Sequence, residues 1–339
     1  MESGARVAVK RPTIYDVAKA AGVSKSLVSL VLQDSPKVGE ESRRAVREAI
    51  SELGYRPSRA AANLAAGRTR VVGVLIDDYT NLWFVDLVRG LHASLGPAGY
   101  RLSVVDIATD DQAEDPVEQF LSMRVDGMVV GTDPPRALSG EGLPPIVVVG
   151  TREVPAGGAS FDSVANDDAE GGRLVARHLV ELGHRRLGHL AVASGAGRAR
   201  RSAFEAEARA LGAYVISTDE ATSASDHAGY DGARALLAAD PEITGLFAAN
   251  DVLAVGALAA ARDLGREVPG DLSVVGYDDT SLAVARLVGL TTVDDLSFEV
   301  GERAGALLLD RMRGGAADPA RVQLQPLLTV RGTTAAPGS

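Results

Sequence analysis

Apolar residues follow a helical period near the start of the chain. From Ile14 to Ala21 they recur three and four positions apart, which predicts a short helix with one buried face. Gly22 allows a tight turn, and Ser24 is a favoured N-cap for a second helix that begins at Lys25. Two short helices joined by a glycine turn are typical of a helix-turn-helix, whose second helix enters the DNA major groove. An ordinary helical hairpin would show the same spacing.

The same pattern predicts the faces of the following helices. The second helix is expected to bury Val28, Val31 and Leu32. Its outward face is expected to consist of Lys25, Ser26, Ser29 and Leu30. A third helix opens after Gly39 with acids in its first turn, where the helix dipole favours them, and Gly54 ends it. Three helices within residues 12–56 would form one small domain.

From residue 70 onward, short apolar runs alternate with helical stretches. The strand-like runs are 71–76, 102–106, 127–130, 146–149, 187–192, 213–217, 246–249 and 272–276. The helical stretches include 84–95, 116–123, 171–182, 201–211, 229–237 and 252–264. Continuous apolar strands between crossover helices predict parallel sheets that are covered on both faces. Because these strands are too many for one compact sheet, we expect an α/β fold of two doubly wound lobes.

Charge is divided unevenly between these two regions. The first 70 residues hold 13 Lys and Arg against 7 Asp and Glu, a balance of +6. Of the chain's 35 basic and 45 acidic residues, the remainder holds 22 and 38, a balance of −16. A basic head is attracted to phosphates, and an acidic body limits non-specific adhesion. The division favours a nucleic-acid partner for the head alone.

Composition excludes several classes of protein. The chain has no apolar run long enough to span a membrane, and residues 1–11 show no secretory signal but a basic lead-in. The absence of cysteine excludes disulfides, and five scattered histidines lack metal-ligand spacing. We therefore expect a cytoplasmic, nucleoid-associated protein without a metal or cofactor.

The amino-acid sequence of the head resembles that of the LacI (lactose repressor) family of transcriptional regulators. The matching motifs are Ile-Tyr-Asp-Val-Ala from Ile14, Ala-Gly-Val-Ser from Ala21, Val28-Ser29, Val38-Gly39-Glu40-Glu41 and Leu53-Gly54-Tyr55-Arg56-Pro57. The resemblance implies a helix-turn-helix head, a hinge helix and a sensor similar to a periplasmic binding protein. The implied domains are a DNA-binding domain at 12–56, a hinge at 57–69, an effector-binding domain at 70–331 and a disordered tail at 332–339. Within the sensor, the implied N-lobe covers about 70–165 plus 295–323, and the C-lobe covers about 166–294 plus 324–331.

The resemblance also implies which residues contact DNA. They are Thr13, Tyr15, Ser24, Lys25, Ser26, Ser29, Leu30, Arg59 and Leu64. Many relatives have threonine at the position of Leu27 and arginine at that of Leu30, so the recognition helix departs from the family at two places. Leu64 matches the family's wedging leucine, which enters the minor groove and unstacks a base step. Without the resemblance, the alanine-rich hinge would be a linker.

Effector-binding candidates follow the predicted strands, where ligands of open α/β sheets sit. They are Asp77, Trp83, Phe84, Asn166, Asp167, Ser194, Arg200, Asn250 and Asp278. Trp83 is the only tryptophan and would suit a sugar face or a flat base, or else belong to the core. The family usually has the reverse order of Asn166-Asp167, and these residues could simply cap a helix. In the family, an arginine at the position of Arg200 reaches the effector.

Two patterns raise the alternative of an enzyme. Residues 195–200 resemble a dinucleotide loop, but Arg200 stands where GxGxxG requires its third glycine. Asp278 and Asp279 could form an acid/base pair, but adjacent side chains rarely enter one site, and no nucleophile accompanies them. We therefore predict no catalytic residues and no enzyme activity.

The combined prediction is a homodimeric repressor whose affinity for double-stranded operator DNA is controlled allosterically by a small molecule. Hydrogen-bonding groups around an aromatic residue favour a sugar or sugar derivative as effector. A purine or another nitrogenous metabolite is the alternative. A solute-binding protein is a further alternative, which the basic head and the missing export signal disfavour.

Overall fold

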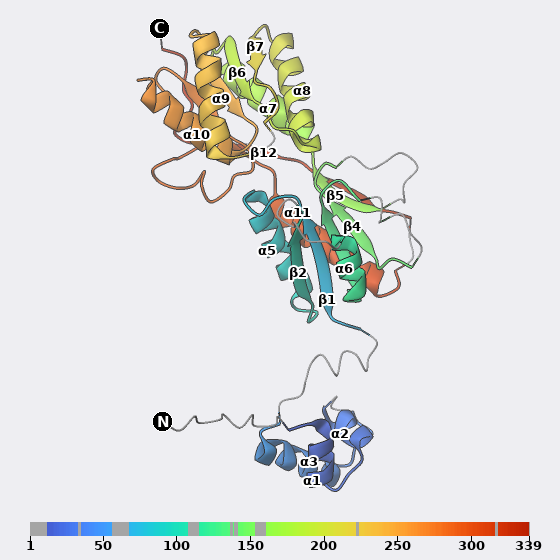
Figure 1. Cartoon of the computed structure of the whole chain (residues 1–339). Coiled ribbons are helices and arrows are strands. Elements are labelled where there is room, and N and C mark those ends of the chain that lie inside the picture. Colours follow the sequence, from blue (N-terminus) through green and yellow to red (C-terminus); the bar gives the residue numbers. More distant parts are fainter. Residues whose placement is uncertain are drawn as a thin grey trace, which may run out of the picture. The chain divides into compact units, whose positions relative to one another are not determined.

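The computed structural model describes residues 12–32, 35–55, 68–107, 115–135, 138, 142–152, 161–221, 224–315 and 318–338. The chain divides into two compact units, residues 1–69 and 70–339, and each has a core of its own (Figure 1). The predicted lead-in and nearly all of the predicted hinge lie outside the described residues. Within the described part of the chain, every helix is too short or too polar to cross a membrane.

The first unit contains the predicted helix-turn-helix and a third helix. Its helices are α1 (Ile14–Ala20), α2 (Lys25–Leu32) and α3 (Glu40–Leu53). Thr13 and Asp16 form a capping box that begins α1, and Gly54 ends α3 in the left-handed conformation at φ 60°. Val17, Val28 and Val46 are completely buried and join the three helices in one core.

Two leucines of α2 differ from the sequence prediction. Leu32 was expected to face inward but is 37% exposed, because Val28 and Val31 fill the inward face and Leu32 is the last residue of the helix. Leu30 was expected to point outward but is half-buried and packs against the edge of the head core, since it flanks Val31. Leu30 therefore has both a packing role and a partly exposed surface.

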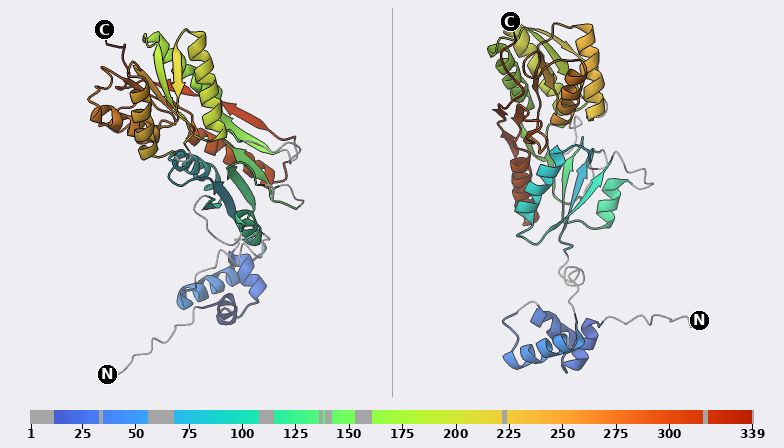
Figure 2. Two further views of the ribbon diagram at one scale, coloured as in Figure 1. Left: turned by 45° about the horizontal axis from the view of Figure 1, so that its top comes forward. Right: turned by 90° about the vertical axis from the view of Figure 1, so that its left-hand side faces the viewer.

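The second unit begins with an N-lobe built on a parallel sheet. Its early elements are β1 (Val71–Ile76), α5 (Trp83–Leu95), β2 (Arg101–Asp106), α6 (Pro116–Ser122), β3 (Gly127–Gly131), β4 (Ile146–Val149) and β5 (Asp162–Asn166). The N-lobe also includes two elements from near the end of the chain. The helix α11 (Ser297–Met312) packs on the sheet, and β11 (Arg321–Leu324) is one of its strands. Among the described residues, the strand order is β11-β5-β4-β3-β1-β2, with parallel pairs throughout. Figure 2 shows α5 and α11 side by side on one face of this sheet, and α6 covers the other face.

The C-lobe repeats this three-layer plan. Its elements are α7 (Asp168–Glu181), β6 (Arg186–Leu190), α8 (Gly195–Ala210), β7 (Tyr214–Ser217), α9 (Asp226–Ala239), β8 (Gly245–Ala248), α10 (Asp251–Asp263) and β9 (Ser273–Val275). The described sheet has the parallel order β7-β6-β8-β9. One core lies under α9 and α10 and another under α7 and α8. The predicted pair of doubly wound lobes is confirmed.

Several elements were absent from the sequence-based prediction. They are β5, α11, β11 and the antiparallel ribbon of β10 (Thr292–Asp294) with β12 (Leu327–Thr329). Three of these elements are strands of only three or four residues, and β5 alternates buried with half-buried side chains instead of forming a continuous apolar run. They matter because the described chain crosses between the lobes after β5, between β10 and α11, and between β11 and β12.

The C-terminal segment corrects another prediction. Residues 332–339 were expected to form a disordered tail, yet Thr333 is only 4% exposed. The Val274 amide donates to the Thr333 carbonyl at 2.8 Å, and the Thr333 hydroxyl donates to the Val274 carbonyl at 2.7 Å. The Ala335 carbonyl lies 2.9 Å from His184 Nε2. The described residues 332–338 are held in place because Thr333 satisfies peptide groups of the edge strand β9.

Candidate functional site

The exposed face of the head carries most of the predicted DNA contacts that the structure describes. Tyr15 on α1 is 64% exposed, and Lys25 on α2 places its Nζ 3.4 Å from the Tyr15 hydroxyl. The Ser24 hydroxyl accepts a hydrogen bond from the Leu27 amide, and Ser26 is exposed beside it. Tyr15 of α1 and Lys25 of α2 therefore lie together on one exposed polar surface, and the Lys25 ammonium group gives this surface a positive charge.

The remaining predicted DNA-contact residues either form hydrogen bonds within the head, are half-buried, or lie outside the described residues. Thr13 is exposed, but its hydroxyl donates to Asp16 at 2.7 Å within the capping box. Ser29 is half-buried. Arg59 and Leu64 lie outside the described residues. Contact of these residues with DNA stays a prediction.

A cavity of about 540 Å³ opens in the second unit, where strands of both lobes end. Its described lining consists of Asp77, Asp78, Thr80, Asn81, Trp83, Gly150, Thr151, Arg152, Asn166, Asp168, Val192, Ala193, Ser194, Ala196, Arg200, Ala224, Ala249, Asn250 and Asp278. The volume suits a small molecule, because such sites measure about 300–1,000 Å³. The position beyond the carboxyl ends of parallel strands is the expected one for a ligand of an α/β sheet.

Arg200 on α8 lies at the centre of a buried ion cluster and is only 7% exposed. Its Nε donates to Asp168 Oδ1 at 2.7 Å. Its Nη1 donates to the Ala249 carbonyl at 2.7 Å and to Asp278 Oδ1 at 3.3 Å. Asp295, which is completely buried, lies 3.8 Å from Nη2. We call Arg200, Asp168, Asp278 and Asp295 the arginine cluster.

Tyr277 holds this arginine in place. The guanidinium carbon of Arg200 lies 3.5 Å from the centre of the buried Tyr277 ring, a cation–π contact. The Asn166 amide nitrogen donates to the Tyr277 hydroxyl at 3.3 Å and to Asp168 at 3.0 Å. A Cβ at Gly171 would overlap the Tyr277 ring, so this glycine lets α7 approach the cluster.

Asp278 combines a strained backbone with a perturbed carboxyl. Its φ is 98°, a value that residues with side chains rarely adopt and that occurs mainly where surrounding structure enforces it. Burial raises the pKa of Asp278 to about 8, and the opposing attraction of Arg200 is too small to reverse the shift. The neighbouring Asp279 instead pairs with Arg331 at 2.7 Å. The two adjacent carboxylates therefore do not enter the pocket together.

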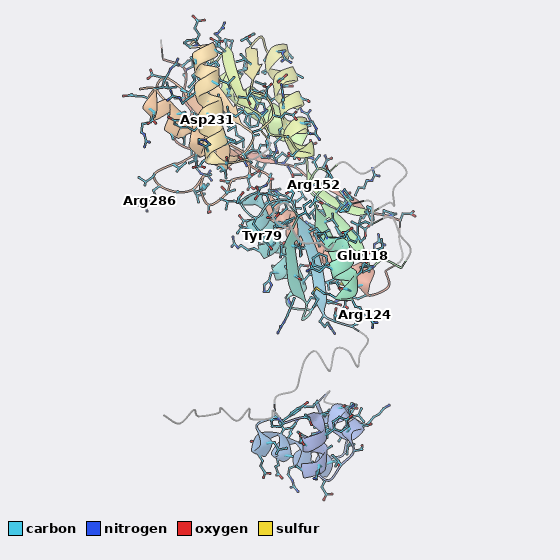
Figure 3. The ribbon with its side chains drawn as sticks, in the orientation of Figure 1. Tyr79, Glu118, Arg124, Arg152, Asp231 and Arg286 are labelled. Carbon is cyan, nitrogen blue, oxygen red and sulfur yellow. The ribbon has the colours of Figure 1, made fainter. Side chains whose placement is uncertain are left out.

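The N-lobe contributes an ion pair and an aromatic ring to the lining. Arg152 Nη1 lies 2.8 Å from Asp77 Oδ2, and Figure 3 shows Arg152 near the junction of the lobes. Burial raises the pKa of Asp77 even though Arg152 opposes the shift. Trp83 is 6% exposed and meets the Phe84 ring edge-on at 5.0 Å, so it belongs to the N-lobe core as well as to the lining.

The structure brings most of the predicted effector residues together. The described lining includes Asp77, Trp83, Asn166, Ser194, Arg200, Asn250 and Asp278. It does not include Phe84, whose ring is 3% exposed in the N-lobe core. Nor does it include Asp167, whose carboxylate caps α7 by accepting from the Glu170 amide at 2.9 Å. Ser194 and Asn250 also cap helices, α8 and α10, while they line the pocket.

Two lining residues of evident chemical importance were missed. Asp168 comes directly after the predicted Asn166-Asp167 pair as the first residue of α7, and its carboxylate lies 3.0 Å from the Asn166 amide nitrogen. Arg152 follows the predicted strand 146–149, so the rule that located the other candidates would have found it. Contact of any of these residues with an effector stays a prediction.

Comparisons with known proteins cover almost the entire chain. Residues 13–58 match the family model of bacterial regulatory proteins of the lacI family, and residues 176–334 match a periplasmic binding protein-like domain. The chain is 32% identical over 338 residues to the HTH-type transcriptional repressor PurR of Yersinia pestis bv. Antiqua, covering 95% of this chain and 97% of the relative.

Solved structures agree with these matches. A LacI-family transcriptional regulatory protein from Corynebacterium glutamicum is 47% identical with a TM-score of 0.71, covering 79% of this chain and 99% of that chain. The lac repressor dimer bound to operator and the anti-inducer ONPF is 27% identical with a TM-score of 0.83, covering 96% and 100%. A complex of the transcriptional regulator CelR with cellobiose is 29% identical with a TM-score of 0.68, covering 95% and 100%.

Proposed function

The chain belongs to the LacI family of DNA-binding transcriptional regulators, and on that premise we propose that it represses transcription under the control of a small molecule. The observation that carries this proposal is the near full-length match to a transcriptional repressor in a chain whose second unit contains a ligand-sized pocket. Because the pocket lining comes from both lobes, a ligand would favour one relative position of the lobes over another.

We propose a purine-like, flat nitrogenous metabolite as the effector. The relative of near full length is named PurR, which favours the purine alternative over the sugar that the sequence pattern favoured. Trp83 offers an aromatic ring in the lining, and Asn250 and Asp278 offer polar groups for the edges of a base. A sugar remains the second candidate because a similar structure is a complex with cellobiose.

We also propose that the protein acts as a homodimer. Val85 on α5 is 49% exposed and Phe298 on α11 is 41% exposed, on helices that pack together. A surface groove next to them is lined by Val88, Arg89, His92, Ala93, Arg101, Leu102, Val104 and Phe298. Apolar side chains gathered in this way are typical of an association surface, and the similar lac repressor structure is a dimer on its operator.

A titration of labelled operator DNA tests the proposed control. The protein is added to its operator with adenine, guanine, hypoxanthine, ribose or cellobiose at increasing concentration, and fluorescence anisotropy reports binding. We expect a purine to change the operator affinity at least about fivefold, the lower limit of typical coupling free energies. If cellobiose or ribose changes the operator affinity and no purine does, the effector is a sugar and not a purine. Binding to no DNA sequence in preference to others would refute the repressor itself.

Base reading by α2 gives a separate prediction. Replacing Leu30 with arginine should shift the preferred base to guanine at one position of each half-site, because arginine binds guanine O6 and N7 and leucine offers only apolar contact. The discrimination should reach about 1–3 kcal/mol. Selection of binding sites from a random DNA library measures it.

The matched control for this variant is Ser51→Arg on α3. Ser51 is exposed and neutral, so the substitution adds one positive charge to the head outside α2, as Leu30→Arg does within α2. Both variants should bind phosphates more strongly, but only Leu30→Arg should change the selected sequence. Identical profiles for Leu30→Arg and the unmodified protein would show that the exposed part of Leu30 does not face a base.

A further inference from the structure

The described lining of the pocket holds more negative than positive groups. Its carboxylates are Asp77, Asp78, Asp168 and Asp278, and its cations are Arg152 and Arg200. The formal balance of this lining is therefore −2, and the completely buried Asp295 adds another carboxyl beside Arg200. A surplus of buried carboxylates is costly, because each ionised group loses its hydration and repels its neighbours.

The cations of the lining are already engaged by the protein. Arg152 pairs with Asp77 at 2.8 Å. Arg200 donates from Nε to Asp168 and from Nη1 to Asp278. Its Nη1 also donates to the Ala249 carbonyl, and Asp295 lies near Nη2. An anionic ligand would have to displace these carboxylates from the arginines. The described pocket is thus poorly suited to a phosphate or a carboxylate.

One carboxylate oxygen in the lining lacks a partner. Asp168 is 2% exposed, and its Oδ1 accepts hydrogen bonds from Arg200 and Asn166. Its Oδ2 has no hydrogen-bond partner among the described residues although it is buried. A buried acceptor without a donor destabilises the folded protein, so a donor supplied by a ligand would recover that free energy.

We infer that the effector places a nitrogen donor with positive charge, such as a protonated amine or an amidine-like edge, against Asp168 and Asp278. This inference rests on the proposed function, because it takes the pocket as the effector site. A nitrogen donor would satisfy the free oxygen of Asp168, and its positive charge would offset the carboxylate of Asp278 once that group is ionised. Purine bases are neutral at pH 7, so among them only the need for a nitrogen donor applies, and it favours those that carry an exocyclic amino group over their oxo counterparts.

The pH dependence of binding follows from the groups that face Asp278. These are Arg200 from α8, Asp168 from α7, Asp251 from α10, and Tyr277 and Asp295 from the segments that follow β9 and β10. Burial raises the pKa of Asp278 to about 8, so at lower pH this carboxyl holds a proton that a cation must displace. Affinity for a permanent cation should therefore rise, by about 25-fold in all, between pH 6.5 and pH 8.5, as the ionised fraction of Asp278 increases.

Three probes of one shape test the inference in the unmodified full-length protein. Benzamidine, benzamide and benzoate are cationic, neutral and anionic at neutral pH, and isothermal titration calorimetry measures the affinity of each. We expect benzamidine to bind at least about tenfold more tightly than benzamide, with benzoate the weakest. No binding of benzamidine, equal binding of benzoate, or an affinity for benzamidine that does not rise with pH would overturn the inference.

Three variants locate the effect. Asp168→Asn should abolish most of the preference for benzamidine over benzamide. Asp167→Asn removes the same charge one residue away, keeps a good N-cap and should leave the preference unchanged. Asp278→Asn should abolish the pH dependence of the affinity for benzamidine. It provides a second test of the inference if Asp168→Asn folds poorly. An unchanged preference in both pocket variants would refute the assignment of these carboxylates. If a purine still altered operator affinity in that case, the proposed function would stand without the inferred charge.

Discussion

Replacement of Arg200 with alanine is expected to lower the free energy of unfolding by about 3–5 kcal/mol. The variant leaves Asp168, Asp278 and Asp295 buried around a site that has lost its cation. A loss of this size is a large part of the total stability of a protein, which is commonly about 5–15 kcal/mol. Urea unfolding followed by circular dichroism measures it, in the second unit's transition if the two units unfold separately.

The control for this variant is Arg209→Ala on the same helix. The Arg209 side chain is 56% exposed and pairs with Glu205 at 2.8 Å, so its loss should cost less than about 1 kcal/mol. Comparable losses for the two variants would show that Arg200 does not hold the cluster together.

The effect of Arg200→Ala should also depend on pH. Burial raises the pKa of Asp278 to about 8 and that of Asp295 well above its ordinary value. The folded carboxyls therefore bind protons more tightly than the unfolded ones, and the free energy of unfolding falls as the pH rises from about 4 towards 8. Without Arg200 these pKa values should rise further. The loss in stability should thus be larger at pH 8.5 than at pH 5.5, and a loss that grows in acid would contradict this account.

Replacement of Leu64 with serine is expected to weaken specific operator binding by about 10- to 100-fold, or about 1.4–2.8 kcal/mol. The resemblance assigns this leucine to wedging between base pairs, which serine cannot do because it lacks the apolar bulk. Binding to non-specific DNA, which depends on phosphate contacts, should be nearly unchanged. Anisotropy with operator and with scrambled DNA measures both quantities.

The matched control for the hinge is Ala62→Ser, which adds a hydroxyl to the same alanine-rich segment without removing the leucine. It should reduce operator affinity much less than Leu64→Ser. Hydrogen exchange of residues 58–66 then tests the mechanism, since ordering costs about 1–2 kcal/mol per residue and is expected only on operator DNA. Amides that are already protected without DNA would show that the hinge is formed beforehand.

The sequence alone determined the parts of this protein that depend on local rules. The helical period from Ile14 to Ala21, the turn at Gly22 and the cap at Ser24 predict α1 and α2 to within a residue. The continuous apolar runs predict the central strands of both lobes, because strands buried on both faces must be apolar throughout. Pocket residues such as Asp77 and Asn250 were found because parallel strands bring their carboxyl ends to one edge.

Tertiary structure alone decided features that depend on contacts between distant residues. The partners of Arg200 lie 32, 78 and 95 positions away in Asp168, Asp278 and Asp295, and no local pattern connects them. Thr333 is ordered because the edge of β9 accepts it, although its own segment has no strand or helix pattern. Burial gives Asp278 a raised pKa that its sequence neighbours do not encode, since desolvation is a property of the folded surroundings. Local periodicity thus fixes the elements and the edge where the pocket lies, whereas the charge state of that pocket arises only when packing excludes water from it.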